Sequence, residues 1–157
     1  MLFLACTEVE AQFKGIHKAH HAAKPNYSTK DYVTLKDVLK LEHYEVKFPL
    51  YPELKSFKPF ENWVPSNPTK SLFWYDNYNA VKHNSETEFA KASLESAVSA
   101  ICAFSILLKA QYGIFIPFWK EQLGSFYEIQ HDYEWQPDEM LLPPYNGFEW
   151  KEKKHPF

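Results

Sequence analysis

The chain has 157 residues, a formal net charge of −3 and an isoelectric point near 6.2. Its length predicts one domain, which can bury about two thirds of the unfolded surface. The negative charge argues against broad non-specific binding of nucleic acid, because such binding needs a basic field. All 17 basic residues are Lys and none is Arg, the usual bidentate phosphate ligand, while aromatic residues reach 18% and predict a core rich in rings.

The two cysteines, Cys6 and Cys102, lie in apolar helical contexts, which predicts buried thiols in a reducing compartment. The opening residues lack the basic region of a signal peptide. No continuous apolar run reaches the ~18 residues that a membrane span needs. We therefore expect a cytoplasmic protein without a membrane partner.

The first part of the chain predicts two helices. Residues 2–21 carry apolar side chains at helical spacing, namely Leu2, Ala5, Val9, Phe13 and Ile16. Ser28 then opens a second helix, with Asp31 as its partner in a capping box, and this helix is expected to continue to about His43.

Residues 44–66 change character. Tyr44 to Phe48 alternate as in a short strand, and four prolines follow among aromatic residues. This composition indicates an ordered but irregular connection that covers the helices. Its larger rings are expected to fill gaps at the surface of the core: Phe57, Phe60 and Trp63.

A pair of helices over residues 67–112 is predicted to organise the fold. Asn67 and Pro68 form a start signal, since Asn can cap a helix and Pro suits its first position, so the first helix is expected over 68–83.

The second helix of the pair is expected over 86–112. Ser85 and Glu88 form a capping box at its start, and Gly113 suits its end. The many Ala and Ser residues of this helix allow close approach of neighbouring helices.

After Gly113 the pattern is mixed, with a short helix expected between Phe118 and Gln130 and extended, Pro-limited segments beyond it. We interpret residues 113–157 as an irregular C-terminal extension of a core formed by residues 1–112. The predicted fold class is all-α, a single helical domain built as a bundle of four or five helices, with an aromatic and Pro-rich covering and room for a small β-hairpin.

The helix over 68–83 has two faces. Its apolar stripe has i, i+4, i+7 spacing and should face the core: Trp74, Tyr78 and Val81. Asp76, Asn79 and His83 fall on the opposite side. They form either a solvated helix face or a ligand site.

The segment WYDNYNAVKH, from Trp74 to His83, has an aromatic lead, a Tyr-Asn pair and a Lys-His end, and a helix rich in small residues follows it. In these features the chain resembles the HEPN superfamily, and Ala5 to Glu10 resembles the first helix of some bacterial HEPN-like proteins. The resemblance covers roughly residues 1–112 and implies a compact helical bundle. Many members are metal-independent ribonucleases of toxin–antitoxin and phage-defence systems, so it also implies RNA or nucleotide binding and a homodimer or an antitoxin-like partner.

The ribonuclease motif of that superfamily is an Arg, four to six intervening residues, and a His. His83 matches the His, but the three possible Arg positions hold non-basic residues: Tyr78, Asn77 and Asp76. The implied chemistry needs a cation to hold the phosphate, and a carboxylate would repel it. Lys82 or Lys70 could supply a point charge but not the planar fork of Arg. The resemblance therefore supports the fold more than the activity.

The candidate site follows from this resemblance. Its catalytic residues are His83, Asn79 and Asp76, and its ligand-binding residues are Lys82, Tyr78 and Glu8. Glu8 flanks the apolar stripe of the first helix and could reach Lys82 or His83, or else remain a solvated carboxylate.

No cofactor is expected. His17, His20 and His21 could bind a metal in part, but no Cys or carboxylate nearby completes a ligand set, so they are interpreted as a cationic helix end.

Three functions remain open. The first is a HEPN-like protein associated with nucleotide or RNA binding, a defence or toxin–antitoxin component with weak or no ribonuclease activity. The alternative is a non-catalytic protein-interaction module whose aromatic, Pro-rich segments dock a partner protein, and the third is a His-based metal binder. If His83 lines a cleft with other polar groups, the first is favoured; if it points into solvent, the interaction module is favoured.

Overall fold

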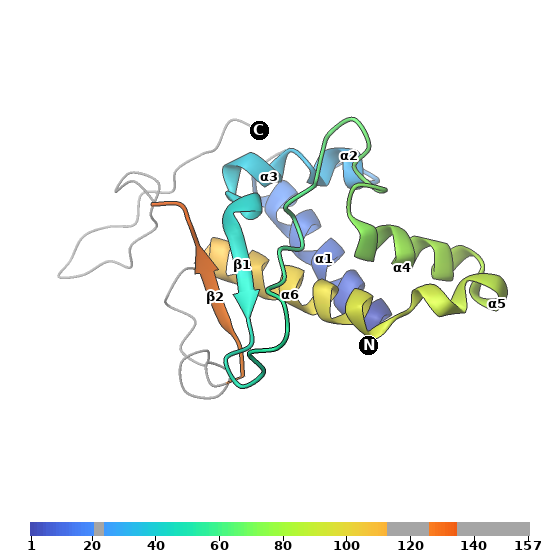
Figure 1. The fold of residues 1–157 in the computed structure, drawn as a ribbon. Helices are drawn as coiled ribbons and strands as arrows, with labels where there is room; N and C mark the ends of the chain where they lie inside the picture. Colours follow the sequence, from blue (N-terminus) through green and yellow to red (C-terminus); the bar gives the residue numbers. More distant parts are fainter. Residues whose placement is uncertain (21–23, 113–125, 135–157) are drawn as a thin grey trace.

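Figure 1 shows the computed structural model, which describes residues 1–20, 24–112 and 126–134. The described chain is mostly helical with a small antiparallel sheet, as the sequence predicts. Its elements, in which η denotes a 3₁₀ helix, are α1 (Leu2–His20), α2 (Thr29–Tyr32), α3 (Leu35–Val38), η1 (Leu41–His43), β1 (Tyr44–Lys47), α4 (Phe73–His83), α5 (Ser85–Glu88), η2 (Phe89–Lys91), α6 (Leu94–Tyr112) and β2 (Glu128–His131).

Helix α1 closely follows its predicted range and buries one face. The buried residues repeat with helical spacing: Leu2, Ala5, Cys6, Val9, Phe13 and His17. Ile16, predicted within the stripe, is only partly buried, and His17 takes a buried place at the end of it. The ring of Phe13 stacks on Tyr32 with centroids 5.2 Å apart, which holds α1 against α2.

The single helix predicted from Ser28 to His43 is wrong, because this segment is divided into α2, α3 and η1. The capping box itself is confirmed, since the Ser28 N–H donates to the Asp31 carboxylate at 2.8 Å. The chain later turns at Lys40, whose backbone is left-handed with φ of 54°. A continuous α-helix cannot contain such a residue.

Helix α4 ends where the sequence predicts but begins at Phe73, five positions after Pro68. The reason is a side-chain bond from five residues earlier: the indole N–H of Trp63 donates to the Pro68 carbonyl at 2.8 Å. This bond holds the predicted helix start in a turn against the preceding connection.

The capping box predicted at Ser85 does not open the long helix either. The short elements α5 and η2 follow it, and α6 begins only at Leu94. The cap is Ser93, whose hydroxyl accepts the Ser96 N–H at 3.1 Å and thereby satisfies a donor of the first turn.

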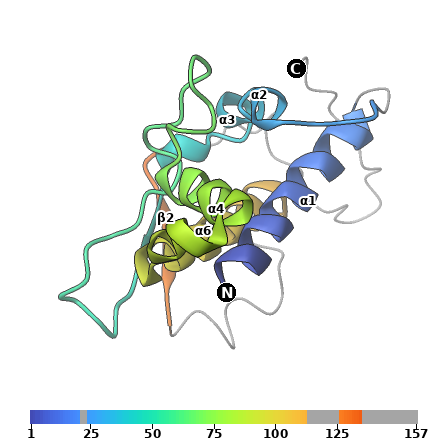
Figure 2. The ribbon, with the colours of Figure 1, turned by 90° about the vertical axis from the view of Figure 1, so that its right-hand side faces the viewer.

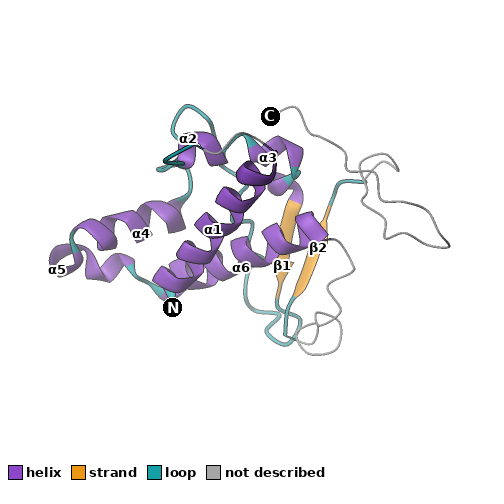
Figure 3. Ribbon diagram, turned by 180° about the vertical axis from the view of Figure 1, so that it is seen from behind, coloured by secondary structure: helices purple, strands orange, loops and turns teal. Residues whose placement is uncertain are grey.

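Helix α6 lies at the centre and packs against both α1 and α4, and Figure 3 shows α1 crossing it. Its buried small residues are Ser96, Ala97, Ser99, Ala100, Cys102, Ala103 and Ser105. By length and composition α6 could cross a membrane, although the sequence predicts no such segment. Half of that apolar window is buried inside the protein, as in a core helix.

The sheet joins segments that are distant in sequence. Val46 of β1 faces Ile129 of β2, and on its other side it exchanges two backbone hydrogen bonds with Phe57, of 2.8 and 2.9 Å. The strand β2 replaces the end of the short helix predicted up to Gln130, whereas residues 113–125 and 135–157 lie outside the described residues. As predicted, rings of the Pro-rich connection enter the core: Phe60 and Trp63 are fully buried, and Phe57 is partly buried and packs against the core cluster.

Candidate functional site

Helix α4 has the two predicted faces. Trp74, Tyr78 and Val81 are buried, while Asp76 and Asn79 are half-buried and His83 is exposed. Within the described residues, no side-chain hydrogen bond or ion pair joins Asp76, Asn79 or His83 to one another. The three residues share a side of α4, but the structure does not bring them together into a cluster.

Two of the predicted ligand-binding residues do meet. The Lys82 ammonium donates to the Tyr78 hydroxyl at 3.1 Å and lies 5.0 Å from the centroid of its ring. The hydrogen bond to Tyr78 raises the pKa of Lys82 above its usual value, so this ammonium stays charged. The edge of Phe3 packs on Tyr78 at 5.4 Å between centroids, which places the pair beside α1.

The carboxylate that reaches α4 is Glu10 and not Glu8, which is exposed. The Tyr75 hydroxyl donates to Glu10 at 2.7 Å, and Lys14 lies 3.5 Å from the other carboxylate oxygen. The spacing along α1 could have identified Glu10, because Phe3, Cys6 and Glu10 repeat at i, i+3 and i+7 and so share one side of the helix.

These contacts define the α1–α4 seam, made of Cys6, Glu10, Tyr75, Tyr78 and Lys82, along the two helices that lie side by side in Figure 2. Burial raises the pKa of the Cys6 thiol to about 12, with a further rise from Glu10 that Lys82 opposes. Burial and the bond to Glu10 raise the pKa of Tyr75 as well. Neither group ionises near neutral pH, so the seam holds the helices together and offers no activated nucleophile.

Two of the three positions at which the ribonuclease motif would carry its Arg serve the packing of α4 instead. The Asn77 amide donates to the Ser96 hydroxyl at 2.9 Å and so serves the contact with α6, and Tyr78 is buried. Lys70 is exposed and lies before α4 begins. Lys82 is therefore the described cation next to His83 in the sequence, and Lys14, paired with Glu10, is a second cation beside the seam.

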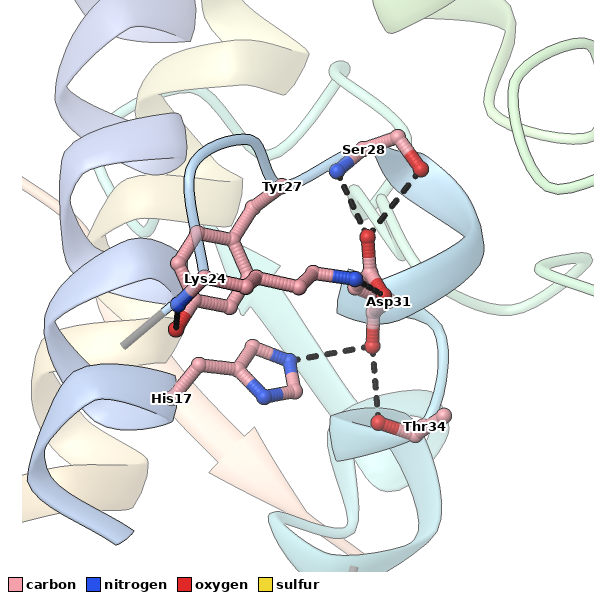
Figure 4. Close-up of polar contacts among 6 residues, drawn as sticks. All are labelled: His17, Lys24, Tyr27, Ser28, Asp31 and Thr34. Atoms are coloured by element: carbon pink, nitrogen blue, oxygen red, sulfur yellow. Dashed lines mark hydrogen bonds and ion pairs between the residues drawn. The ribbon is translucent and has the colours of Figure 1, made fainter. Parts of the chain in front are cut away.

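The histidine cluster at the end of α1 is a structural junction. Figure 4 shows that Nε2 of His17 points at the Asp31 carbonyl, 3.0 Å away, so this nitrogen carries the proton and donates. The His17 ring stacks on Tyr27, and Lys24 pairs with the Asp31 carboxylate. In the described part of the chain no group of three or more His, Cys, Asp or Glu side chains could hold a metal ion, and His21 lies outside it.

A second surface lies at the end of the β1–β2 pair. We call it the ribbon tip, and its large apolar side chains are Leu50, Tyr51 and Leu54, exposed by 62%, 52% and 50%. An open pocket of about 420 Å³ lies beside them, lined by Lys47, Phe48, Pro49, Pro52, Leu54, Ser56 and Glu128. The sequence predicts the Pro-rich character of this segment but not which of its rings are buried.

Comparison with known proteins found no match: no family model, no curated protein and no solved structure is similar to this chain.

Proposed function

We propose that this chain is a non-catalytic protein-interaction module that binds a partner protein through the ribbon tip. The observation that carries the proposal is the division of the Pro-rich connection into two parts. Phe60 and Trp63 are buried and anchor it to the core, whereas the tip holds Leu50, Tyr51 and Leu54 in solvent.

The tip has the chemistry of a recognition surface. Large apolar side chains grouped on an anchored segment can be covered with little loss of conformational freedom. The pocket between Phe48 and Leu54 offers a place for one apolar anchor of the partner, of the kind that dominates interface energetics. Lys47 and Glu128 also line the pocket, and polar groups of this kind fix the orientation of a bound partner.

The surroundings of His83 support binding without catalysis. A general acid or base must lie within hydrogen-bond reach of the proton that it transfers, among groups that hold the substrate. His83 is exposed at the end of α4, and in the described part of the chain no side-chain hydrogen bond joins it to the seam.

The test is capture of the partner from extracts of the source cells with tagged wild-type protein and with Leu54→Asp. We expect one partner to be captured by the wild type and lost with Leu54→Asp, while Phe73→Asp, at the start of α4 and exposed by 46% against 50% for Leu54, retains it. Equal capture by all three proteins would exclude the ribbon tip as the binding surface.

A second candidate is a HEPN-like protein associated with RNA or nucleotide binding, a defence or toxin–antitoxin component of the cytoplasm that is built as a helical bundle. Its support is the exposed pair Lys82 and His83 at the end of α4, with the ammonium held charged by Tyr78.

This candidate predicts that a labelled oligonucleotide binds more weakly on the alkaline side of neutrality than on the acidic side. It also predicts that His83→Ala removes this difference, and that cleavage in the absence of metal is slow or absent. Affinity that neither pH nor the substitution changes would leave the interaction module as the remaining proposal.

A further inference from the structure

The pocket beside the ribbon tip contains one carboxylate whose charge is not paired within the described residues. Glu128 begins β2, is exposed, and shares the pocket with four apolar residues: Phe48, Pro49, Pro52 and Leu54. No ion pair and no side-chain hydrogen bond from the described chain reaches this carboxylate. A charged acceptor is therefore available next to apolar walls.

The cation that lies opposite Glu128 in the sheet is engaged elsewhere. Lys47 is the partner of Glu128 in the register of β1 and β2, a position from which opposite charges attract across strands. Its ammonium instead lies 2.8 Å from the Glu45 carboxylate and donates to the side-chain oxygen of Gln130 at 2.7 Å. The charge of Lys47 is thus compensated on its own strand, and that of Glu128 is not.

A second cation, Lys109 of α6, is also occupied. It is half-buried and donates to the Ile129 carbonyl. Burial lowers the pKa of Lys109, and the negative charge of Glu128 opposes this effect. The two side chains are not joined by an ion pair in the part of the chain that the structure describes, so their attraction acts beyond contact distance and leaves the Glu128 oxygens open to a ligand.

These features select the chemistry of the group that fits the pocket. The long side chains of Lys and Arg can lay an aliphatic stem along apolar walls while the charged head reaches a carboxylate. Glu128 would repel an anionic group, and a purely apolar group would remove the carboxylate from water without giving it a partner. The pocket volume of about 420 Å³ is sufficient for one such side chain.

We propose that the pocket beside the ribbon tip binds a cationic side chain of the partner protein, Lys or Arg, with its aliphatic stem against Phe48 and Leu54 and its charged head at Glu128. This inference rests on the proposed function, because it names the group that the partner protein places in that pocket.

NMR titration of the isotopically labelled full chain tests the pocket directly with small probes. Butylammonium and butylguanidinium reproduce the stem and head of Lys and Arg, and butylurea is a neutral analogue with a planar head. At constant ionic strength the amide signals of Leu54 and Ser56 should shift. The better cation should bind at least about twofold more tightly than butylurea, because an exposed ion pair adds modestly to affinity. That cation also shows which of the two side chains fits.

Two matched substitutions isolate the carboxylate. Glu128→Gln should reduce the affinity for the cation to that for butylurea. Glu86→Gln removes the same charge from an exposed position of α5 and should leave both affinities unchanged. Equal binding of the cations and butylurea, no shift at the pocket with any probe, or a cation affinity that Glu128→Gln leaves unchanged would overturn the proposal.

Partner capture separates this failure from failure of the proposed function. Leu54→Ser is the suitable variant, because it removes an apolar wall without adding an anion that a cation could bind. Capture that is lost with Leu54→Ser but complete with Glu128→Gln would reject the cationic side chain alone. Capture that is complete with both variants would reject the pocket beside the ribbon tip as the binding site.

Discussion

A single hydrogen bond distinguishes the carboxylate of α1 that contacts α4 from the one that faces solvent. Glu8 and Glu10 have the same side chain two positions apart, yet only Glu10 accepts the Tyr75 hydroxyl, at 2.7 Å. Each step of two residues on a helix turns the side chain by about 200°. The carboxylate at Glu8 therefore leaves on the solvent side while Glu10 enters the seam.

Tyr75→Phe should lower the free energy of unfolding by about 1 kcal/mol, because it removes the donor to a partly buried carboxylate. Urea denaturation measures this difference. Glu8→Gln is the matched control and should leave the midpoint unchanged, since Glu8 is exposed. Equal effects of the two substitutions would contradict the assignment of Glu10 to the seam.

Cys6 and Cys102 should both be free thiols that a thiol reagent reaches only after unfolding, because both are buried and burial raises the pKa of each to about 12. Ellman's reagent should count both in denatured protein without reductant and none quickly in native protein at neutral pH. Rapid native reaction would show that the core opens.

These thiols also give a sign for alkaline stability. In the native protein the two thiols keep their protons up to about pH 12, whereas in the unfolded chain they lose them near pH 9. The stability that the two protonated thiols contribute is fully present below pH 9 and is lost as the pH rises from 9 to about 12. Unfolding by urea at increasing alkaline pH should therefore become easier, and less so in Cys102→Ala than in the wild type.

At the scale of elements, competing helix caps are resolved by packing. Ser85 with Glu88 satisfies the pattern of a capping box, but the start of the core helix is at Ser93. Starting α6 there buries the small-residue face from Ser96 onward between α1 and α4. The residues before Ser93 carry Phe89, which remains exposed, so their helical turn gains little from the core.

Ser93→Ala should destabilise the protein by about 1 kcal/mol through loss of the N-cap. Ser85→Ala tests the cap that the sequence favours and should cost clearly less, since Ser85 lies exposed within α5. Thermal melts of the two variants compare them directly. A larger loss of stability in Ser85→Ala than in Ser93→Ala would show that Ser85 is the more important cap.

Ala97→Leu should destabilise by about 1–3 kcal/mol, because Ala97 is 6% exposed on the face of α6 that meets other helices, and added methylenes force that contact apart. Ala90→Leu adds the same volume at an exposed position of η2 and should be close to neutral. An unchanged melting temperature for Ala97→Leu would show that α6 is not closely packed there.

At the scale of the whole molecule, the described chain presents surfaces with different tasks. The seam joins α1 to α4, and the ribbon tip is proposed for a partner protein. Tyr75→Phe acts on the seam and should lower stability while partner capture is retained, whereas Leu54→Asp should remove capture and leave the free energy of unfolding unchanged, because the two surfaces share no residue. Loss of capture with Tyr75→Phe would show that the two surfaces are coupled.

Local sequence determined the features that depend on nearest neighbours along the chain. The helical spacing of apolar residues predicted α1 and the buried stripe of α4 that includes Trp74, and the end of α4 was also predicted. The sequence pattern of a capping box predicted the bond between Ser28 and Asp31. The excess of aromatic residues correctly indicated a ring-rich core.

Only the tertiary structure decided the rest, because it depends on side-chain bonds and packing that no local pattern specifies. The Trp63 indole displaced the helix start from Pro68, and pairing with β1 made Glu128–His131 a strand. Packing against α4 selected Glu10 over Glu8. A local pattern offers several caps, faces and partners of nearly equal energy, and long-range contacts worth about a kilocalorie each choose among them.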